Sequence, residues 1–199
     1  LMEPLATGVA AARRGRVGPG KKVAILGAGP IGLLCLQVCR AFGADRVAVT
    51  EVQPGRLGQA AAMGADAVID ASTEHVVERL REETGGEGPD VVIEAAGAEE
   101  AARQAIEAVR PGGTVLLVGI APESVFPVNV ARIVQSELEV RGLFRYANTF
   151  PTAVRLCARG AVDLKPLITH EFPLQRVVEA FEMAAAGGDG LLKIMIRVS

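Results

Sequence analysis

Residues 22–32 read KVAILGAGPIG, and this stretch decides the fold. Its first five residues are mostly apolar, as expected for a short strand that is buried on both faces of a parallel sheet. Three glycines follow in the spacing G-x-G-x-x-G, at Gly27, Gly29 and Gly32. Pro30 suits the first turn of a helix, because its fixed φ is helical and its missing N–H would have no partner there. The stretch therefore predicts a strand, a tight turn and a helix in direct succession.

The same alternation of short apolar runs and amphipathic stretches continues as far as residue 145. The expected strands lie at 22–26, 46–50, 67–69, 90–93, 114–118 and 138–141. Between them, apolar residues recur every three or four positions, which predicts helices near 30–43, 54–63, 73–83, 98–109 and 128–136. Six strands joined by five crossovers predict an α/β fold, with a doubly wound parallel sheet of six strands in the order 3-2-1-4-5-6.

The pattern changes after residue 145. Helical spacing is found at 151–160 and 174–187, and the apolar run 191–198 predicts a late strand with no crossover to the first sheet. We therefore predict two parts. Residues 1–145 form the doubly wound domain, led by an N-terminal helix that Pro4 begins, and residues 146–199 form a C-terminal appendage of helices and a strand, whose strand belongs to another sheet.

Composition and charge exclude several classes of protein. The chain has 199 residues, 50% of them hydrophobic, and a net charge of −2, so no basic surface points to nucleic acid or to membrane lipid. No apolar run reaches transmembrane length, and the first residues do not resemble a secretory leader. Cys35, Cys39 and Cys157 are too few for a disulfide framework, which favours a reducing, cytoplasmic location. Cys35 and Cys39 lie on one helix face, and we interpret them as core residues.

The glycine stretch predicts a site for a dinucleotide, as in a Rossmann fold. Gly27 permits the tight turn, Gly29 lets the backbone approach a pyrophosphate, and Gly32 lets the helix lie close to the strand. The N-terminus of the helix then directs N–H groups and a positive dipole end at the phosphates. The pattern gains weight because it directly follows a predicted strand and begins a predicted helix.

A carboxylate at the end of the second strand indicates which dinucleotide is bound. Glu51 lies 19 residues after Gly32, where an acid can accept hydrogen bonds from both hydroxyls of the adenosine ribose. The same carboxylate would repel a 2′-phosphate, so the sequence favours NAD over NADP. Arg56 leaves two alternatives open, because its side chain could stack on the adenine or tolerate a phosphate.

The ends of the fourth and fifth strands are rich in small residues. Ligands of open α/β sheets bind at the carboxyl ends of the strands, so Ala96, Gly97 and Gly119 would leave room for a nicotinamide ring and its ribose. Glu94 also lies at this edge. It could contact the ligand, or it could cap the turn that follows its strand.

Several longer stretches resemble one family when they are taken together. They are GAGPIG at 27–32, TEVQPGRL at 50–57, MGADAVID at 63–70, PGGTVLLVG at 111–119, LFRYANTFPTAVRL at 143–156 and HEFPLQRVVEAFE at 170–182. The chain resembles the medium-chain zinc-dependent dehydrogenases over nearly its whole length, and within them the sorbitol (polyol) dehydrogenase branch. The glycine loop is generic, whereas residues 143–148 are more particular to the polyol branch.

The resemblance implies roles for individual residues. Gly29, Pro30 and Ile31 would hold the pyrophosphate, Glu51 the adenosine ribose, and Arg56 would flank the adenine. The residues implied to line the nicotinamide are Val118, Gly119, Ile120, Leu143 and Phe144. Arg145 and Tyr146 would reach the hydroxyls of a polyol, and Glu3 would lie beside the catalytic zinc and touch its bound water or the substrate.

The sequence also departs from this family. The cysteine, histidine and glutamate that bind the catalytic zinc would all precede position 1, and the four-cysteine structural zinc motif is absent. His75, at the start of a surface helix, and His170, in a loop, are interpreted as surface residues. We therefore predict no complete metal site, and we expect the Glu3 carboxylate to be exposed and without a partner. The cluster of Arg13, Arg14 and Arg16 is interpreted as a solvated helix face.

Two functions of different classes follow. In the first, the chain is the NAD-binding half of an oxidoreductase that transfers a hydride between NAD and a secondary alcohol of a polyol, with zinc in the parent enzyme but not bound by this chain alone. Threonine and simpler secondary alcohols are alternative substrates. In the second, the chain is an NAD-binding module without catalysis. The resemblance also implies a homodimer or tetramer, joined through the sheet edge near 138–142, where an unpaired strand would be exposed.

Overall fold

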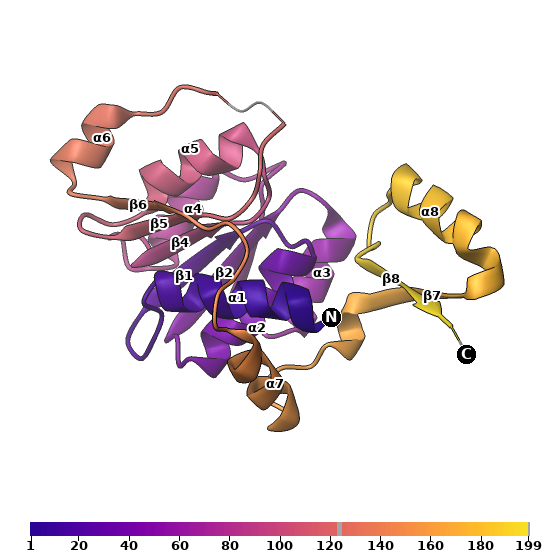
Figure 1. The fold of residues 1–199 in the computed structure, drawn as a ribbon. Coiled ribbons are helices and arrows are strands. Elements are labelled where there is room, and N and C mark those ends of the chain that lie inside the picture. Colours follow the sequence, from indigo (N-terminus) through magenta and orange to yellow (C-terminus); the bar gives the residue numbers. More distant parts are fainter. Residues whose placement is uncertain (123–124, 199) are drawn as a thin grey trace.

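A single parallel sheet of six strands forms the centre of the molecule (Figure 1). The computed structural model describes residues 1–122 and 125–198. The strands are β1 (Lys22–Leu26), β2 (Arg46–Glu51), β3 (Ala67–Asp70), β4 (Val91–Glu94), β5 (Thr114–Leu117) and β6 (Glu139–Gly142). Their order is β3-β2-β1-β4-β5-β6 and every pairing is parallel, which confirms the predicted doubly wound sheet.

Helices cover both faces of this sheet. They are α1 (Met2–Arg14), α2 (Pro30–Ala41), α3 (Pro54–Ala62), α4 (Val76–Glu82), α5 (Glu99–Ala108), α6 (Val130–Gln135) and α7 (Phe150–Ala158). Alternate residues of β1 therefore enter two different cores: Ile25 packs with the side chains of α1 and α2, while Ala24 and Leu26 pack with those of α4 and α5. Burial on both faces explains why β1, β2, β4 and β5 are nearly continuous apolar runs rather than alternating ones. The edge strands β3 and β6 are only partly buried.

The cysteines of α2 belong to the first of these cores. Cys35 and Cys39 are fully buried, which confirms their interpretation as core residues. Burial disfavours the thiolate and raises the pKa of Cys35 to about 12, and the pKa of Cys39 is raised for the same reason. Because the thiolate is the reactive form, these two thiols are chemically inert.

The N-terminal helix α1 packs along α2. Gly8 allows this close approach, since a Cβ at that position would lie 3.3 Å from the backbone of Leu34. The helix begins at Met2, and the prediction that Pro4 begins it was wrong by two residues. Proline is tolerated there because the first N–H groups of a helix have no intrahelical acceptor.

The end of α1 is joined to the segment that follows β6. Arg13 donates to the carbonyl oxygen of Asn148 at 3.1 Å and to Oγ1 of Thr152 at 2.7 Å. Arg14 donates to the carbonyl oxygen of Gly142 at 2.8 Å. These side chains are exposed, as expected for a solvated helix face, and Arg13 and Arg14 also join residues 142–152 to the domain.

The last part of the chain builds a second, smaller sheet. It contains two 3₁₀ turns (Lys165–Leu167 and Leu174–Arg176), β7 (Ile168–Pro173), α8 (Val177–Ala186) and β8 (Lys193–Arg197). Strands β7 and β8 pair in parallel, and with α8 they stand to one side of the main sheet (Figure 1). The late strand thus belongs to another sheet, as predicted. His170 lies in β7, so the prediction that it occupies a loop was wrong.

A short loop attaches this unit to the main domain. The carboxylate of Asp189 accepts the N–H of Gly55, at the N-terminus of α3, at 3.0 and 3.1 Å. The division into residues 1–145 and 146–199 stays a prediction, and α7 and Leu167 bury side chains in the same core as α1 and α2. In the described residues, no helix has the length and apolarity needed to cross a membrane.

Candidate cofactor site

The glycine turn between β1 and α2 is sterically restricted to glycine at two positions. Gly27 has a φ of +101°, and a Cβ there would lie 2.8 Å from the backbone of Ala96. A Cβ on Gly32 would lie 1.8 Å from the carbonyl oxygen of Gly27. These contacts bring α2 against the end of β1 and β4, so the turn is built by close backbone packing.

Gly29 differs from the other two glycines. It is the N-cap residue of α2, in an extended conformation, and a Cβ there would meet nothing within 4 Å. The space above the N-terminus of α2 is therefore open, and Pro30 and Ile31 stand beside it, partly buried. Open space at the N-terminus of a twelve-residue helix suits an anion such as a pyrophosphate.

Glu51 lies at the end of β2 with its side chain buried. Its Oε2 accepts the N–H of Ala28 at 2.9 Å, and its Oε1 accepts those of Val52 at 2.8 Å and Gln53 at 3.2 Å. A carboxylate offers about four acceptor positions, so three N–H groups leave capacity for a ligand hydroxyl. The carboxylate is thereby fixed beside the glycine turn.

A cavity of about 410 Å³ opens between the glycine turn and the ends of β2 and β4. Its lining residues are Gly27, Gly29, Thr50, Glu51, Val52, Gln53, Arg56, Ala71, Ala95, Ala96, Ala98, Glu100, Ala101 and Gln104. Four of the predicted cofactor residues (Gly27, Gly29, Glu51 and Arg56) are thus brought together. The others lie at or just after the carboxyl ends of strands or on α5, positions from which most of them could have been predicted.

Arg56 lies at the edge of this cavity, and its guanidinium is held on two sides. Its Nη1 is 4.0 Å from Oε2 of Glu51, and its Nη2 donates to the carbonyl oxygen of Leu191 at 3.2 Å. Its predicted contact with an adenine stays a prediction.

Glu94, at the end of β4, caps the turn that follows. Its Oε1 accepts the N–H groups of Ala96 at 2.8 Å and Gly97 at 2.7 Å, so the capping alternative describes its contacts. Burial raises the pKa of Glu94, although the N–H groups that it accepts act in the opposite direction. Gly97, with a φ of +67°, packs directly on Gly119, where a Cβ would lie 2.2 Å from the nitrogen of Gly97.

Val118 and Ile120 flank this junction. Val118 is partly buried against the first core, whereas the side chain of Ile120 is 79% exposed. Their predicted contact with a nicotinamide stays a prediction.

A second hollow, of about 370 Å³, lies beside the end of α1. Its lining residues are Ala10, Arg13, Arg14, Leu143, Phe144, Arg145, Tyr146, Ala147 and Thr149. Arg145 has a φ of +60°, and its guanidinium lies over the Phe144 ring at 5.1 Å. The ring of Tyr146 meets Phe150 edge-on, with 5.1 Å between the centroids. Four predicted residues, Leu143, Phe144, Arg145 and Tyr146, thus line this hollow. It is separate from the cavity beside the glycine turn, which is called the adenosine cavity below because Glu51 and Arg56 line it.

Glu3 is exposed in the first turn of α1. The N-cap residue of this helix is Leu1, and no side chain caps the helix there. Desolvation raises the pKa of the Tyr146 phenol, and the nearby Glu3 carboxylate raises it further. The prediction of an exposed Glu3 is confirmed, and the expectation that its carboxylate has no partner stays a prediction. Across residues 1–122 and 125–198, no three His, Cys, Asp or Glu side chains form a group that could hold a metal ion.

The strand order and the glycine turn define a Rossmann-type α/β protein. A family model described as zinc-binding dehydrogenase matches residues 30–159. Human sorbitol dehydrogenase is 44% identical over 200 residues, covering 99% of this chain and 55% of that enzyme. The chain belongs to the zinc-type medium-chain dehydrogenases, and it spans about half the length of the curated relatives it matches.

Solved structures agree with this family. An Escherichia coli oxidoreductase of unknown specificity has a TM-score of 0.95 and 37% identity, over 100% of this chain and 57% of that one. A putative zinc-binding dehydrogenase from Sinorhizobium meliloti, solved with NADP bound, has a TM-score of 0.91 and 32% identity, over 98% of this chain and 58% of that one.

Proposed function

We propose that this chain is the NAD-binding part of an oxidoreductase that transfers a hydride between NAD and a secondary alcohol of a polyol such as sorbitol. The observation that carries the proposal is the buried Glu51 carboxylate, held by the N–H of Ala28 at 2.9 Å beside the open N-terminus of α2. An acid fixed in this place suits the ribose hydroxyls of an adenosine.

Each part of the cavity has a role in holding the cofactor. Gly29, Pro30 and Ile31 place the pyrophosphate on the N-terminus of α2, because an added Cβ at Gly29 would project into open space. Glu51 accepts the ribose hydroxyls and Arg56 flanks the adenine. When bound, NAD supplies the hydride acceptor for the alcohol carbon.

The substrate end of the proposal rests on the second hollow. Arg145 and Tyr146 line it and would hold the hydroxyls of a polyol, with Leu143 and Phe144 on the nicotinamide side. Glu3, next to the phenol of Tyr146, would adjoin the zinc of the parent enzyme. Human sorbitol dehydrogenase, 44% identical, supports a polyol as the substrate class, with threonine or a simpler secondary alcohol as alternatives.

A second candidate is an NAD-binding module that performs no chemistry by itself. It is supported by the cavity beside the glycine turn, whose lining includes Gly29, Glu51 and Arg56 and suits a dinucleotide. Both candidates place the protein in the cytoplasm, an inference that rests on the three free cysteines.

Calorimetric titration with NAD and NADP tests the proposal. We expect Glu51→Ala to weaken NAD by about tenfold to a hundredfold, because charged hydrogen bonds to the ribose are lost. NADP should be weakened far less, since the same change removes a repulsion. The exposed acid Glu182 provides a control, and Glu182→Ala should leave both affinities unchanged. A folded chain that does not bind NAD would contradict both candidates, and equal weakening of NAD and NADP would remove the case for selectivity.

A further inference from the structure

Glu94 is a buried acid that the proposed function does not use. Its exposure is 2%, and it lies at the carboxyl end of β4, the strand next to β1 in the sheet. Burying a carboxylate is costly unless hydrogen bonds compensate for the lost water. A buried carboxylate at the cofactor edge of the sheet should therefore have hydrogen-bond partners that compensate for this cost.

The side chain binds the turn after β4. Oε1 accepts the N–H groups of Ala96 and Gly97 at 2.8 and 2.7 Å, so one oxygen fixes two successive residues of this turn. Ala95, Ala96 and Ala98 line the adenosine cavity, which makes the turn one wall of the cofactor site.

The same residue also holds the end of β5. Its backbone carbonyl accepts the N–H groups of Val118 at 2.9 Å and Gly119 at 3.0 Å. Its Oε2 lies only 2.7 Å from the position that a Cβ on Gly119 would occupy, so the carboxylate faces this second segment too. A Cβ on Gly97 would in turn lie 2.9 Å from the carbonyl oxygen of Ile120.

We propose that Glu94 is a positioning residue for NAD: its carboxylate sets residues 96–97 against residues 118–120, and so shapes the part of the site that takes the nicotinamide half of the cofactor. This inference rests on the proposed function, because it concerns how tightly NAD is held. Glu94 does not touch the reacting atoms. It acts through the backbone of the two segments that its carboxylate and carbonyl oxygens bind.

Glutamine is the informative replacement, because it keeps the shape of the side chain. The N–H groups of Ala96 and Gly97 bind Oε1, and those of Ala98 and Gly119 also lower the pKa of the carboxyl group, so N–H groups surround the carboxylate. An amide offers one oxygen and one NH₂ group. In Glu94→Gln, the NH₂ group would replace one carboxylate oxygen and would face backbone N–H groups, so that hydrogen-bond donors would oppose each other. The two segments should then move apart by a small amount while the core of the domain remains.

The experiment compares NAD with AMP on the same protein. AMP needs only the adenosine cavity, whereas NAD also needs the junction of residues 97 and 119. We expect Glu94→Gln to weaken NAD by about tenfold and AMP by less than about threefold, measured by calorimetry. A general loss of structure would weaken both ligands alike, so the ratio separates positioning from stability.

Glu182→Gln is the matched control, because this exposed acid on α8 does not line the cavity and undergoes the same chemical change. It should leave the ratio of the two affinities unchanged. Gly119→Ala is a second probe: its Cβ would displace the same junction while the carboxylate stays, and it should reproduce the selective loss of NAD. It decides the matter if Glu94→Gln does not fold.

Three results would overturn the inference. They are unchanged NAD binding by folded Glu94→Gln, an equal loss of NAD and AMP, and a Gly119→Ala variant that binds NAD as the wild type does. Failure of the wild-type chain to bind NAD is a different result, since it would overturn the proposed function itself.

Discussion

The three glycines of the turn after β1 obey the same sequence pattern for different physical reasons. Gly27 and Gly32 are required by backbone packing, and a Cβ on Gly32 would lie 1.8 Å from a carbonyl oxygen. Gly29 has free space around it, so the fold itself would accept a side chain at this position. A need for glycine there would come from the ligand that occupies the space. The sequence pattern alone cannot separate these two reasons, because both require the smallest residue.

Alanine substitutions should therefore separate stability from binding. We expect Gly32→Ala to lower the free energy of unfolding by about 2–4 kcal/mol, because α2 must move away from β1. Gly29→Ala should change it by less than about 0.5 kcal/mol and yet weaken NAD at least tenfold, since its methyl group occupies the pyrophosphate space. Urea unfolding and calorimetry measure the two quantities. A Gly29→Ala protein with full NAD affinity would place the phosphates elsewhere.

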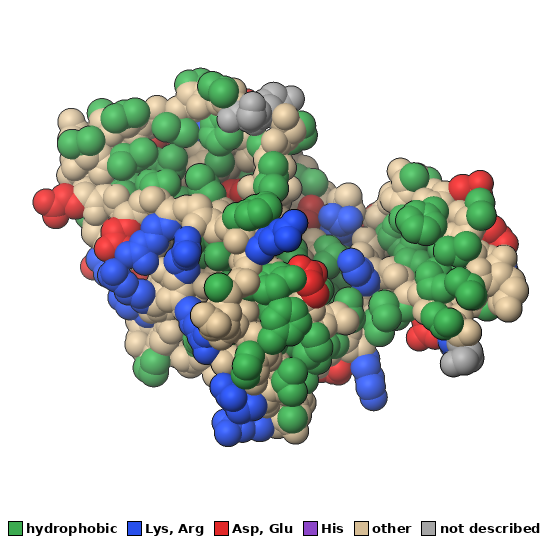
Figure 2. Space-filling model, viewed as in Figure 1, with side chains coloured by type: hydrophobic (Ala, Val, Ile, Leu, Met, Phe, Trp, Pro, Cys, Tyr) green, Lys and Arg blue, Asp and Glu red, His purple; other side chains and the backbone are tan. Residues whose placement is uncertain are grey.

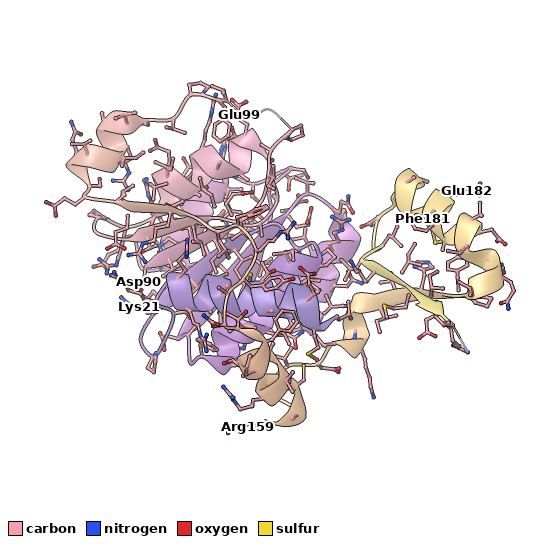
Figure 3. The ribbon with its side chains drawn as sticks, viewed as in Figure 1. Lys21, Asp90, Glu99, Arg159, Phe181 and Glu182 are labelled. Atoms are coloured by element: carbon pink, nitrogen blue, oxygen red, sulfur yellow. The ribbon has the colours of Figure 1, made fainter. Side chains whose placement is uncertain are left out.

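Asp90 is the residue whose ionisation should matter most for stability in acid. Its carboxylate accepts the backbone N–H of Lys22 at 2.9 Å, Nε of Arg110 at 2.9 Å and Nζ of Lys21 at 3.2 Å (Figure 3). Burial pushes its pKa upward, but the N–H of Lys22 and the cations of Arg110 and Lys21 outweigh it, so the pKa is lowered. The stabilisation is therefore complete above the unfolded pKa of about 3.9 and is lost as the pH falls through the folded value.

Asp90→Asn should accordingly destabilise the chain by about 1–3 kcal/mol at pH 7. The difference from the wild type should shrink as the pH is lowered below about 4, because the wild-type carboxylate then becomes neutral as well. Urea unfolding at pH 7, 5 and 3 gives both values. A difference that stays constant over this range would show that the charge of Asp90 does not stabilise the fold.

At the scale of elements, the sequence predicts those strands and helices whose burial gives their apolar residues a regular spacing. The four central strands β1, β2, β4 and β5 were predictable because both of their faces are buried, so their apolar runs are nearly continuous. The edge strands β3 and β6 are only partly buried. Strand β7 was missed because ITHEFP is largely exposed, with Phe172 as its buried residue, and no apolar period results. Gly29 and Glu51 could be predicted as cavity residues because they lie at or just after strand ends, whereas the roles of Arg13 and Arg14 depend on contacts with residues more than 120 positions away.

The loop between α8 and β8 is the element that attaches the small sheet to the domain. Gly187, Gly188 and Gly190 all have positive φ, and Asp189 among them accepts the N–H of Gly55 at the N-terminus of α3. Two residues later, the carbonyl of Leu191 holds the guanidinium of Arg56. One short loop thus contacts both the start of α3 and the edge of the adenosine cavity.

Removing the Asp189 carboxylate should loosen this attachment. We expect Asp189→Ala to increase the rate of proteolytic cleavage within residues 187–190 several-fold, because flexible glycine-rich loops are preferred sites of cleavage. The midpoint of thermal unfolding should fall by only a few degrees, since an exposed capping bond contributes about 1 kcal/mol. Glu182→Ala, an exposed acid on α8, is the control (Figure 3). Cleavage at the wild-type rate would show that other contacts hold the loop.

At the scale of the whole molecule, two surfaces are open to association. The small sheet exposes Leu174, Val178 and Phe181, which form an apolar area on and beside α8 (Figure 2). The main sheet ends at β6, whose outer edge is only partly covered, because Arg14 donates to the carbonyl of Gly142. Open strand edges and apolar areas both favour contact with a second chain.

We expect the β6 edge to be the stronger of these two contacts, because it offers backbone hydrogen bonds as well as apolar area. The N–H groups of Glu139 and Leu143 face β5, so that of Val140, 39% exposed, faces outward. Val140→Pro removes this donor and leaves the β5–β6 pairing in place, so it should weaken the predicted homodimer about tenfold in analytical ultracentrifugation. Val178→Lys charges the 66% exposed Val178 on α8 and is the matched probe of the apolar area. If Val178→Lys separates the dimer while Val140→Pro does not, the small sheet forms the contact and the edge does not.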